Sequence, residues 1–290
     1  MEKIYISDSG PEVSAAIYSF WRWNTSALIN QAKVEDIINY NLELGVNTFD
    51  HSDQYGNGKI EELFGKAIQA RSFKREDIVI STKSGIVKDI KGKNLYYDLS
   101  AKHIKDSVNS SLKKLKTDYI DIFLLEHPDF LFDVEETASV ISELVLTGKI
   151  RFIGVSNFNA SQHRLLAAHL QHPIITNHIE LNLLQTNALN DGRLDFIKEQ
   201  YSKPLAFSPL ADGKILNGKD KKAIKVRKVL QEIGRKYNAN VEQVAVAWLY
   251  KLGALPIIGS PDKKRIKNAA SAYSIDLSRE DWYKLYNATI

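Results

Sequence analysis

Short apolar segments alternate with amphipathic segments along the whole chain, and this alternation restricts the possible fold more than any other feature. Eight runs rich in aliphatic and β-branched residues have the length of buried strands. The predicted strands are 16–20, 46–50, 77–82, 119–125, 151–155, 174–179, 204–207 and 255–258. Strands that alternate with helices pair in parallel through right-handed crossovers. The pattern therefore predicts an α/β protein built on a parallel sheet.

The segments between these strands have the end signals of helices. Ser100, Asp133 and Ser278 stand at N-cap positions, and Gly45 and Gly148 follow C-terminal ends. The predicted helices are 31–44, 59–70, 101–115, 134–147, 160–170, 189–200, 222–237, 241–252, 263–272 and 279–286. Turn-forming residues at 8–11 also predict a short hairpin over 4–13.

Eight strand–helix units without a linker or a break in composition favour a closed barrel over an open sheet. No Gly-x-Gly-x-x-Gly follows the first strand, which argues against a Rossmann domain. We therefore predict a single (β/α)8 TIM barrel over residues 1–290. The hairpin precedes the barrel, and extra helices lie near its C-terminal end.

Polar and aromatic residues gather at the predicted C-terminal ends of the strands, where barrel enzymes place their active sites. The second strand ends at Asp50, with Tyr55 five residues later. The third ends at Lys83, and the fourth at Glu126 and His127. A free Tyr has a pKa of about 10 and would need a nearby cation, such as Lys83, to act as an acid near neutral pH. The spacing predicts a proton-transfer site.

Composition narrows the class of protein. The chain of 290 residues is 44% hydrophobic and 26% charged, which is typical of a soluble globular protein. It has neither a signal-peptide core nor an apolar run near the ~20 residues of a membrane span, so we expect a cytoplasmic protein without membrane contact. We also expect it to act as a monomer. The net charge of +4 is spread along the chain, so we expect no nucleic-acid partner. The absence of cysteine excludes a Cys nucleophile and thiolate metal sites.

Five motifs, taken in order, resemble the pattern of the aldo-keto reductase family. They are Asp50-x4-Tyr55-Gly56, Lys83, the run 120–129 with His127-Pro128-Asp129, Gly154-Val155-Ser156-Asn157-Phe158 and Pro256-Ile257-Ile258-Gly259-Ser260. The resemblance covers about residues 13–288. Trp21-Arg22, the segment 50–53 and the tail containing Trp282 are most similar to a bacterial branch, the YdhF-type oxidoreductases.

This resemblance implies hydride transfer between NADPH and the carbonyl of a small substrate, with Tyr55 as general acid. Lys83 would lower the pKa of Tyr55, and Asp50 would position Lys83. The implied cofactor contacts are Ser156, Asn157 and His178 to the nicotinamide carboxamide, Phe207 to its ring, Ser208 and Leu210 to the pyrophosphate, and Ser260 and Arg265 to the 2′-phosphate. Trp21 and Arg22 are expected in the substrate pocket.

Glu126 departs from the family pattern, because it stands where the family usually has His. His127 comes one position later, and a shift of one residue along a strand points a side chain to the other face. We therefore predict Glu126 as the catalytic partner of Tyr55, with His127 as the fallback if the strand end is irregular. Burial should favour the neutral form of Glu126. The steroid 5β-reductases resemble this chain in carrying Glu at that place, so reduction of a conjugated C=C is an alternative.

Two further alternatives come from other functional classes. A regulatory barrel similar to the potassium-channel β subunits would keep the nicotinamide site and act through a partner protein. A metal-dependent hydrolase would need a cation site, but no His-x-His follows the first strand and Lys83 would repel the ion. We therefore expect no metal.

Overall fold

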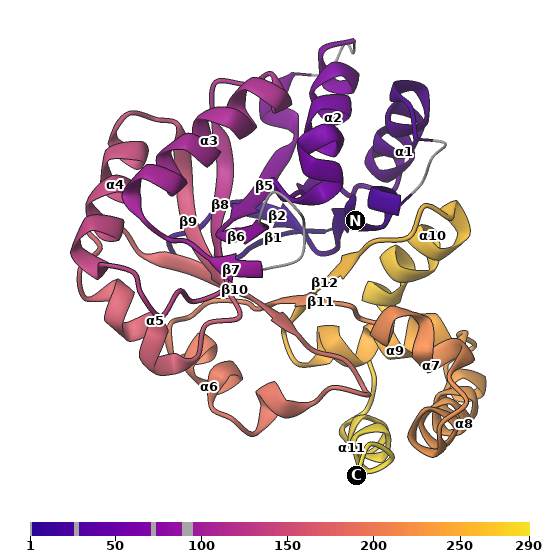
Figure 1. Cartoon of the computed structure of the whole chain (residues 1–290). Coiled ribbons are helices and arrows are strands. Elements are labelled where there is room, and N and C mark those ends of the chain that lie inside the picture. Colours follow the sequence, from indigo (N-terminus) through magenta and orange to yellow (C-terminus); the bar gives the residue numbers. More distant parts are fainter. Residues whose placement is uncertain (1, 26–28, 71–73, 89–94) are drawn as a thin grey trace.

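A closed barrel of eight parallel strands lies at the centre of the molecule (Figure 1). The computed structural model describes residues 2–25, 29–70, 74–88 and 95–290. The barrel strands in chain order are β3 (Ile17–Ser19), β4 (Thr48–Asp50), β5 (Val79–Ser84), β8 (Ile120–Glu126), β9 (Ile150–Ser156), β10 (Ile174–Glu180), β11 (Leu205–Phe207) and β12 (Leu255–Ile258). Pairing of β12 with β3 closes the ring, so the predicted TIM barrel is confirmed.

Helices surround this barrel (Figure 1). They are α1 (Gln31–Glu43), α2 (Lys59–Gln69), α3 (Ala101–Leu115), α4 (Val134–Leu146), α5 (Ala160–Ala167), α6 (Arg193–Glu199), α7 (Lys214–Asn217), α8 (Lys221–Lys236), α9 (Val241–Lys251), α10 (Lys263–Ser271) and α11 (Arg279–Asn287). The predicted N-caps Ser100, Asp133 and Ser278 each accept a hydrogen bond from a backbone N–H of the first turn. Among the described residues no helix is both long and apolar enough to cross a membrane.

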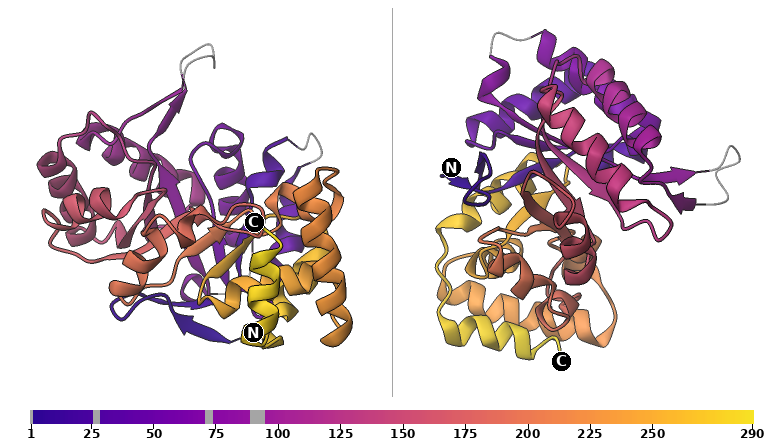
Figure 2. Two further views of the ribbon diagram at one scale, coloured as in Figure 1. Left: turned by 90° about the horizontal axis from the view of Figure 1, so that it is seen from below. Right: turned by 90° about the vertical axis from the view of Figure 1, so that its left-hand side faces the viewer.

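Two antiparallel hairpins lie at opposite ends of the barrel (Figure 2). The predicted N-terminal hairpin is present as β1 (Lys3–Tyr5) and β2 (Glu12–Ser14). Ile6 and Val13, from this segment, pack with barrel residues such as Ile122 in one apolar cluster. A second hairpin, β6 (Ile86–Lys88) with β7 (Leu95–Tyr97), follows β5 and was not predicted. Its strands are three residues long, too short for an alternating pattern to be recognised.

One predicted helix, 189–200, is wrong at its start. Residues 187–189 form a 3-10 turn, and α6 begins only at Arg193. Gly192 precedes it with φ 83°, a left-handed conformation that breaks the helical path. The shortening lengthens the loop after β10 and does not affect β10 itself, Ile174–Glu180.

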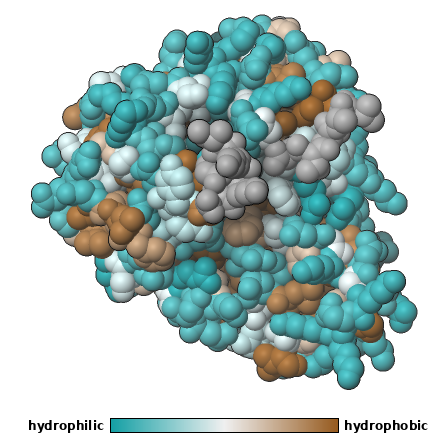
Figure 3. All heavy atoms as spheres, in the orientation of Figure 1, coloured by the Kyte–Doolittle hydropathy of each residue, from teal (hydrophilic) through white to brown (hydrophobic). Residues whose placement is uncertain are grey.

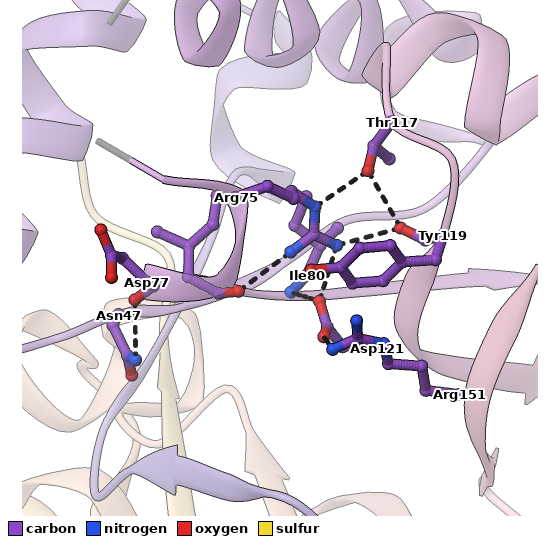
Figure 4. A network of polar contacts seen from close by, with 9 residues as sticks. Asn47, Arg75, Asp77, Ile80, Thr117, Tyr119, Asp121 and Arg151 are labelled. Atoms are coloured by element: carbon purple, nitrogen blue, oxygen red, sulfur yellow. Dashed lines mark hydrogen bonds and ion pairs between the residues drawn. The ribbon is translucent and has the colours of Figure 1, made fainter. Parts of the chain in front are cut away.

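A polar network holds together the N-terminal ends of β5, β8 and β9 (Figure 4). Arg75 donates to Asp121 at 2.7 Å and to the carbonyl of Tyr119 at 3.0 Å. The Tyr119 ring lies between two guanidinium groups, with that of Arg75 4.1 Å and that of Arg151 3.5 Å from its centroid. In (β/α)8 barrels this N-terminal end contributes to stability, and the active site lies at the opposite, C-terminal end of the strands.

The outer surface is mainly polar in the orientation of Figure 1. Figure 3 shows hydrophilic residues over most of this face, with apolar residues in separate small patches. Phe130 and Leu131 are the most exposed large apolar side chains of the described residues, at 82% and 95%. A few exposed apolar side chains are normal on a protein surface, whereas ligand sites are concave.

Candidate active site

One cavity of about 350 Å³ brings together all the site residues that the sequence predicts. It opens at the C-terminal ends of the barrel strands. Its lining includes Trp21, Arg22, Asp50, Tyr55, Lys83, Glu126, His127, Ser156, Asn157, His178, Phe207, Ser208, Leu210, Ser260 and Arg265. The chain positions of these residues span most of the sequence, and the closed barrel is what makes them neighbours.

A buried ion pair forms the floor of this cavity. The Lys83 Nζ atom lies 2.8 and 2.9 Å from the two carboxylate oxygens of Asp50, and it also donates to the carbonyl of His51 at 2.8 Å. Burial is the largest single influence on the pKa of Asp50 and would raise it, but the charge and hydrogen bond of Lys83, with smaller contributions from His178 and Ser19, together outweigh burial and the pKa is lowered. Burial is likewise the largest influence on the pKa of Lys83 and would lower it, but Asp50, Tyr55 and Glu126 together outweigh burial and the pKa is raised. Both groups are therefore charged at neutral pH.

Tyr55 lies directly beside this pair. It begins a 3-10 turn, Tyr55–Gly58, and the centroid of its ring is 4.9 Å from the Lys83 Nζ atom. Burial raises the pKa of Tyr55, although Lys83 acts in the lowering direction as predicted. The net direction is thus opposite to the sequence prediction, because desolvation of the phenol exceeds the effect of the cation. Tyr55 stays protonated at neutral pH, as a proton donor must.

Glu126 is the last residue of β8, and its side chain faces the cavity. Ser52 Oγ donates to its Oε2 atom at 3.2 Å. Burial raises the pKa of Glu126 to about 7; Asp53 and Asp50 add to this rise, whereas Lys83 and the Ser52 hydrogen bond oppose it. The predicted preference of this carboxyl for its neutral form is therefore confirmed in direction.

His127 also lines the cavity, contrary to the expectation that it would face away from Glu126. Its φ is 65°, a left-handed conformation, so the period of two residues that alternates faces along β8 ends before it. The imidazole stacks on Tyr97 of β7, with centroids 4.9 Å apart, and its Nε2 atom lies 3.3 Å from Asn157 Nδ2. Burial lowers the pKa of His127. The strand end is irregular, and both side chains reach the same space.

His178 lies across the cavity with unused hydrogen-bonding capacity. Neither of its buried ring nitrogens has a partner within the described part of the chain. Burial lowers its pKa to about 3, so the ring is neutral and offers one donor and one acceptor. Its ring packs edge-on against that of Phe207, with ring centroids 5.0 Å apart. Ser156, the last residue of β9, pairs with His178, and Asn157 Nδ2 donates to Ser156 Oγ at 3.3 Å. An amide group would satisfy these atoms.

An ion pair joins two loops that border the cavity. Arg22, after β3, donates to Asp212 at 3.1 Å, and Ser208 donates to the same carboxylate oxygen at 3.1 Å. Trp21 covers Gly259, where a Cβ atom would lie only 2.8 Å from the indole. Sequence reasoning did not find Asp212, because it lies in a kinked turn four residues beyond Ser208 rather than at a strand end.

The far end of the cavity lies between the first turns of α9 and α10. Arg265 of α10 donates from Nε to Glu242 Oε1 at 2.6 Å, and Asn268 donates to Glu242 Oε2 at 2.6 Å. Glu242 lines the cavity but was not predicted, since it belongs to a helix and no strand-end pattern marks it. Among the described residues no group of three or more His, Cys, Asp or Glu could hold a metal ion.

The barrel with this site defines the class of protein. The sequence model of the aldo/keto reductase family matches residues 19–289, and the chain belongs to that family. Enzymes of this family are oxidoreductases that use nicotinamide cofactors. The expected similarity to YdhF-type proteins is confirmed, because the chain is 34% identical to oxidoreductase YdhF of Escherichia coli (strain K12), over all of this chain and 98% of that protein.

Two further comparisons agree with this assignment. The chain is 34% identical to a 6-dehydroglucose reductase of Agrobacterium fabrum (strain C58), over all of this chain and 98% of that protein. The crystal structure of the thermostable aldo-keto reductase Tm1743, in complex with the inhibitor epalrestat, matches with a TM-score of 0.87. That match has 27% sequence identity and covers 99% of this chain and 100% of the other.

Proposed function

We propose that the protein reduces the carbonyl group of a small substrate with NADPH, and that Tyr55 donates the proton. The observation that carries this proposal is the buried Asp50–Lys83 pair, which lies against a protonated phenol in the cavity. A phenol with a raised pKa holds its proton until a stronger base forms beside it. The developing alkoxide of a reduced carbonyl is such a base.

The residues of the cavity fit a nicotinamide cofactor along its length. The unsatisfied imidazole of His178, together with Ser156 and Asn157, would hold the carboxamide, and Phe207 would pack on the ring. Ser208 and Leu210 would contact the pyrophosphate. Arg265 and Ser260 would bind the 2′-phosphate that distinguishes NADPH, at the N-terminus of α10. When bound, the reduced nicotinamide supplies the hydride.

The side chains on the floor of the cavity would donate one proton to the substrate and stabilise the negative charge that remains. Tyr55 gives its phenolic proton to the carbonyl oxygen, and the charge of Lys83 stabilises the phenolate that remains. Asp50 and the carbonyl of His51 fix Lys83 in place. Neutral Glu126 would donate a second hydrogen bond to the same oxygen, as protonated carboxyl groups do in oxyanion holes.

We further propose an uncharged carbonyl compound as substrate. Among the described residues that line the cavity, the Lys and Arg side chains are Lys83, Arg22 and Arg265. Lys83 and Arg22 each pair with a carboxylate, and Arg265 lies at the far end assigned to the 2′-phosphate, so none of the three is assigned to a charged substrate group. The relative named a 6-dehydroglucose reductase agrees with a polar, uncharged carbonyl substrate. No comparison favours the conjugated C=C reductase or the regulatory barrel. The cytoplasmic location and the monomeric state stay predictions.

Tyr55→Phe tests the proposal. The variant should bind NADPH with unchanged affinity in a fluorescence titration, and it should lose reduction of a simple aldehyde by about 10²–10⁴-fold, the usual contribution of general acid catalysis. Tyr96→Phe is the matched control, since Tyr96 is an exposed phenol on the nearby hairpin. Unchanged turnover in Tyr55→Phe would remove Tyr55 from the mechanism.

A further inference from the structure

A carboxylate occupies the end of the cavity that Arg265 is expected to keep for a phosphate. Glu242 lies in the first turn of α9, and Arg265 lies in the first turn of α10. Both Glu242 oxygens accept hydrogen bonds from α10, one from Arg265 Nε and one from Asn268 Nδ2, each at 2.6 Å. The Glu242 side chain is 13% exposed and that of Arg265 is 33% exposed, and both residues line the cavity.

The geometry of this pair leaves part of the guanidinium available. Only Nε of Arg265 donates to Glu242, and the two terminal nitrogens make no hydrogen bond within the described residues. A guanidinium held at Nε still presents its terminal nitrogens to an incoming ligand. Glu242 therefore fixes the orientation of Arg265 without blocking the edge that binds phosphate.

The same carboxylate offsets the charge of Arg265. A 2′-phosphate that approaches Arg265 also approaches Glu242, and the repulsion between the two anions weakens the gain from the cation. A 2′-hydroxyl meets the opposite situation, because it can donate a hydrogen bond to a carboxylate oxygen. The positive N-terminal end of α9 favours the negative charge of Glu242 at this position.

We propose that Glu242 determines the cofactor selectivity of this enzyme. Glu242 positions Arg265 but reduces the affinity of this site for a 2′-phosphate. As a result, the protein binds NADPH and NADH with comparable affinity. This inference rests on the proposed function, because it assumes that the cavity binds a nicotinamide nucleotide. It adds that the choice between the two nucleotides depends on a residue outside the phosphate-binding segment.

Glu242→Gln removes the negative charge but keeps Arg265 in place, since the amide oxygen still accepts a hydrogen bond from Arg265 Nε. In isothermal titration calorimetry the variant should bind NADPH about tenfold more tightly and NADH no more tightly than the wild type. The pair 2′,5′-ADP and 5′-ADP should show the same change, and neither probe depends on turnover. Glu242→Ala removes the orienting contact as well, so its NADPH affinity should be lower than that of Glu242→Gln.

Asp36→Asn is the matched control. It removes one negative charge beside the same helix, where Asp36 pairs with the exposed Lys263 at 2.6 Å, but Asp36 does not line the cavity. Its NADPH to NADH ratio should equal that of the wild type. If Glu242→Gln leaves this ratio unchanged, or tightens both nucleotides equally, the role of Glu242 is refuted and the proposed function stands. If the wild type binds neither nucleotide, the proposed function itself fails.

Discussion

The carboxyl group of Glu126 should give this enzyme a pH dependence that Glu126→Gln removes. Its pKa is raised to about 7, so the group is neutral below that pH and ionised above it. A neutral carboxyl can donate a hydrogen bond to the carbonyl oxygen, whereas a carboxylate repels the developing negative charge. Reduction should therefore weaken as the pH rises through 7, and a permanently neutral amide should keep its donor throughout.

The size of this effect follows from the pKa and from the value of one hydrogen bond. With a pKa of about 7, the neutral fraction falls from about nine tenths at pH 6 to about one hundredth at pH 9. Loss of one oxyanion donor costs about 10²–10³-fold in rate. We therefore expect kcat/KM of the wild type to fall by about 100-fold between pH 6 and pH 9, with a slope of one.

Stability provides a second measurement of the same group. The pKa of Glu126 is raised in the folded state from an ordinary value of 4.5, so its contribution to stability is present below pH 4.5 and is lost as the pH rises through 7. Glu126→Gln should accordingly raise the free energy of unfolding at pH 9 by about 3 kcal/mol, since one pKa unit corresponds to about 1.4 kcal/mol. The gain should shrink toward pH 5.

The assay is the rate of aldehyde reduction with saturating NADPH from pH 6 to 9, for the wild type, Glu126→Gln and His127→Ala. His127→Ala is the matched control, because burial lowers the pKa of His127 from its ordinary value, so its imidazole does not account for a fall in rate centred near pH 7. It should keep the fall with pH. A flat profile for the wild type would refute the reasoning, as would a profile that disappears in His127→Ala and persists in Glu126→Gln.

Two further predictions concern residues at opposite ends of the barrel. Arg265→Ala should weaken NADPH binding by about tenfold or more in a fluorescence titration and leave NADH binding nearly unchanged, because a charge-assisted contact is worth about 1.5–3 kcal/mol. Equal losses for both nucleotides would mean that Arg265 supports the fold or a shared contact. Arg75→Ala should lower the free energy of unfolding by about 3 kcal/mol in urea denaturation, because Asp121 loses its shorter ion pair and keeps only the contact with Arg151 at 3.5 Å. A loss of turnover at unchanged stability would contradict this prediction.

The periodic parts of the fold could be predicted from the sequence because periodicity directly reflects burial. The predicted helix 101–115 and strand 255–258 have the same bounds as α3 and β12. Most candidate site residues could also be predicted from the strand ends, since parallel strands in a closed barrel must bring their C-terminal ends together. This geometry explains why residues as distant as Asp50 and Ser260 could be assigned to one cavity.

Features without a period could not be predicted in the same way. The β6–β7 hairpin is too short to show alternation, and Tyr97 on it supports His127 only through its tertiary position. Glu242 contacts Arg265 across 23 positions, and its own helix shows only an ordinary acidic first turn. The net direction of the Tyr55 pKa depends on how fully the phenol is buried, and a sequence gives the neighbouring cation but not the depth.

The end of β8 shows how a change of backbone conformation decides which chemistry a sequence can perform. Had the alternation of the strand continued, Glu126 alone would face the cavity and His127 would lie outside it. The left-handed conformation of His127 instead places an acid and an imidazole side by side, and its backbone N–H donates to Ser156 at 3.1 Å. Burial acts on the two groups in opposite directions, because it raises the pKa of Glu126 to about 7 and lowers the pKa of His127. In the proposed reaction the acid would donate to the substrate oxygen, while the imidazole, stacked on Tyr97, forms part of the wall of the pocket.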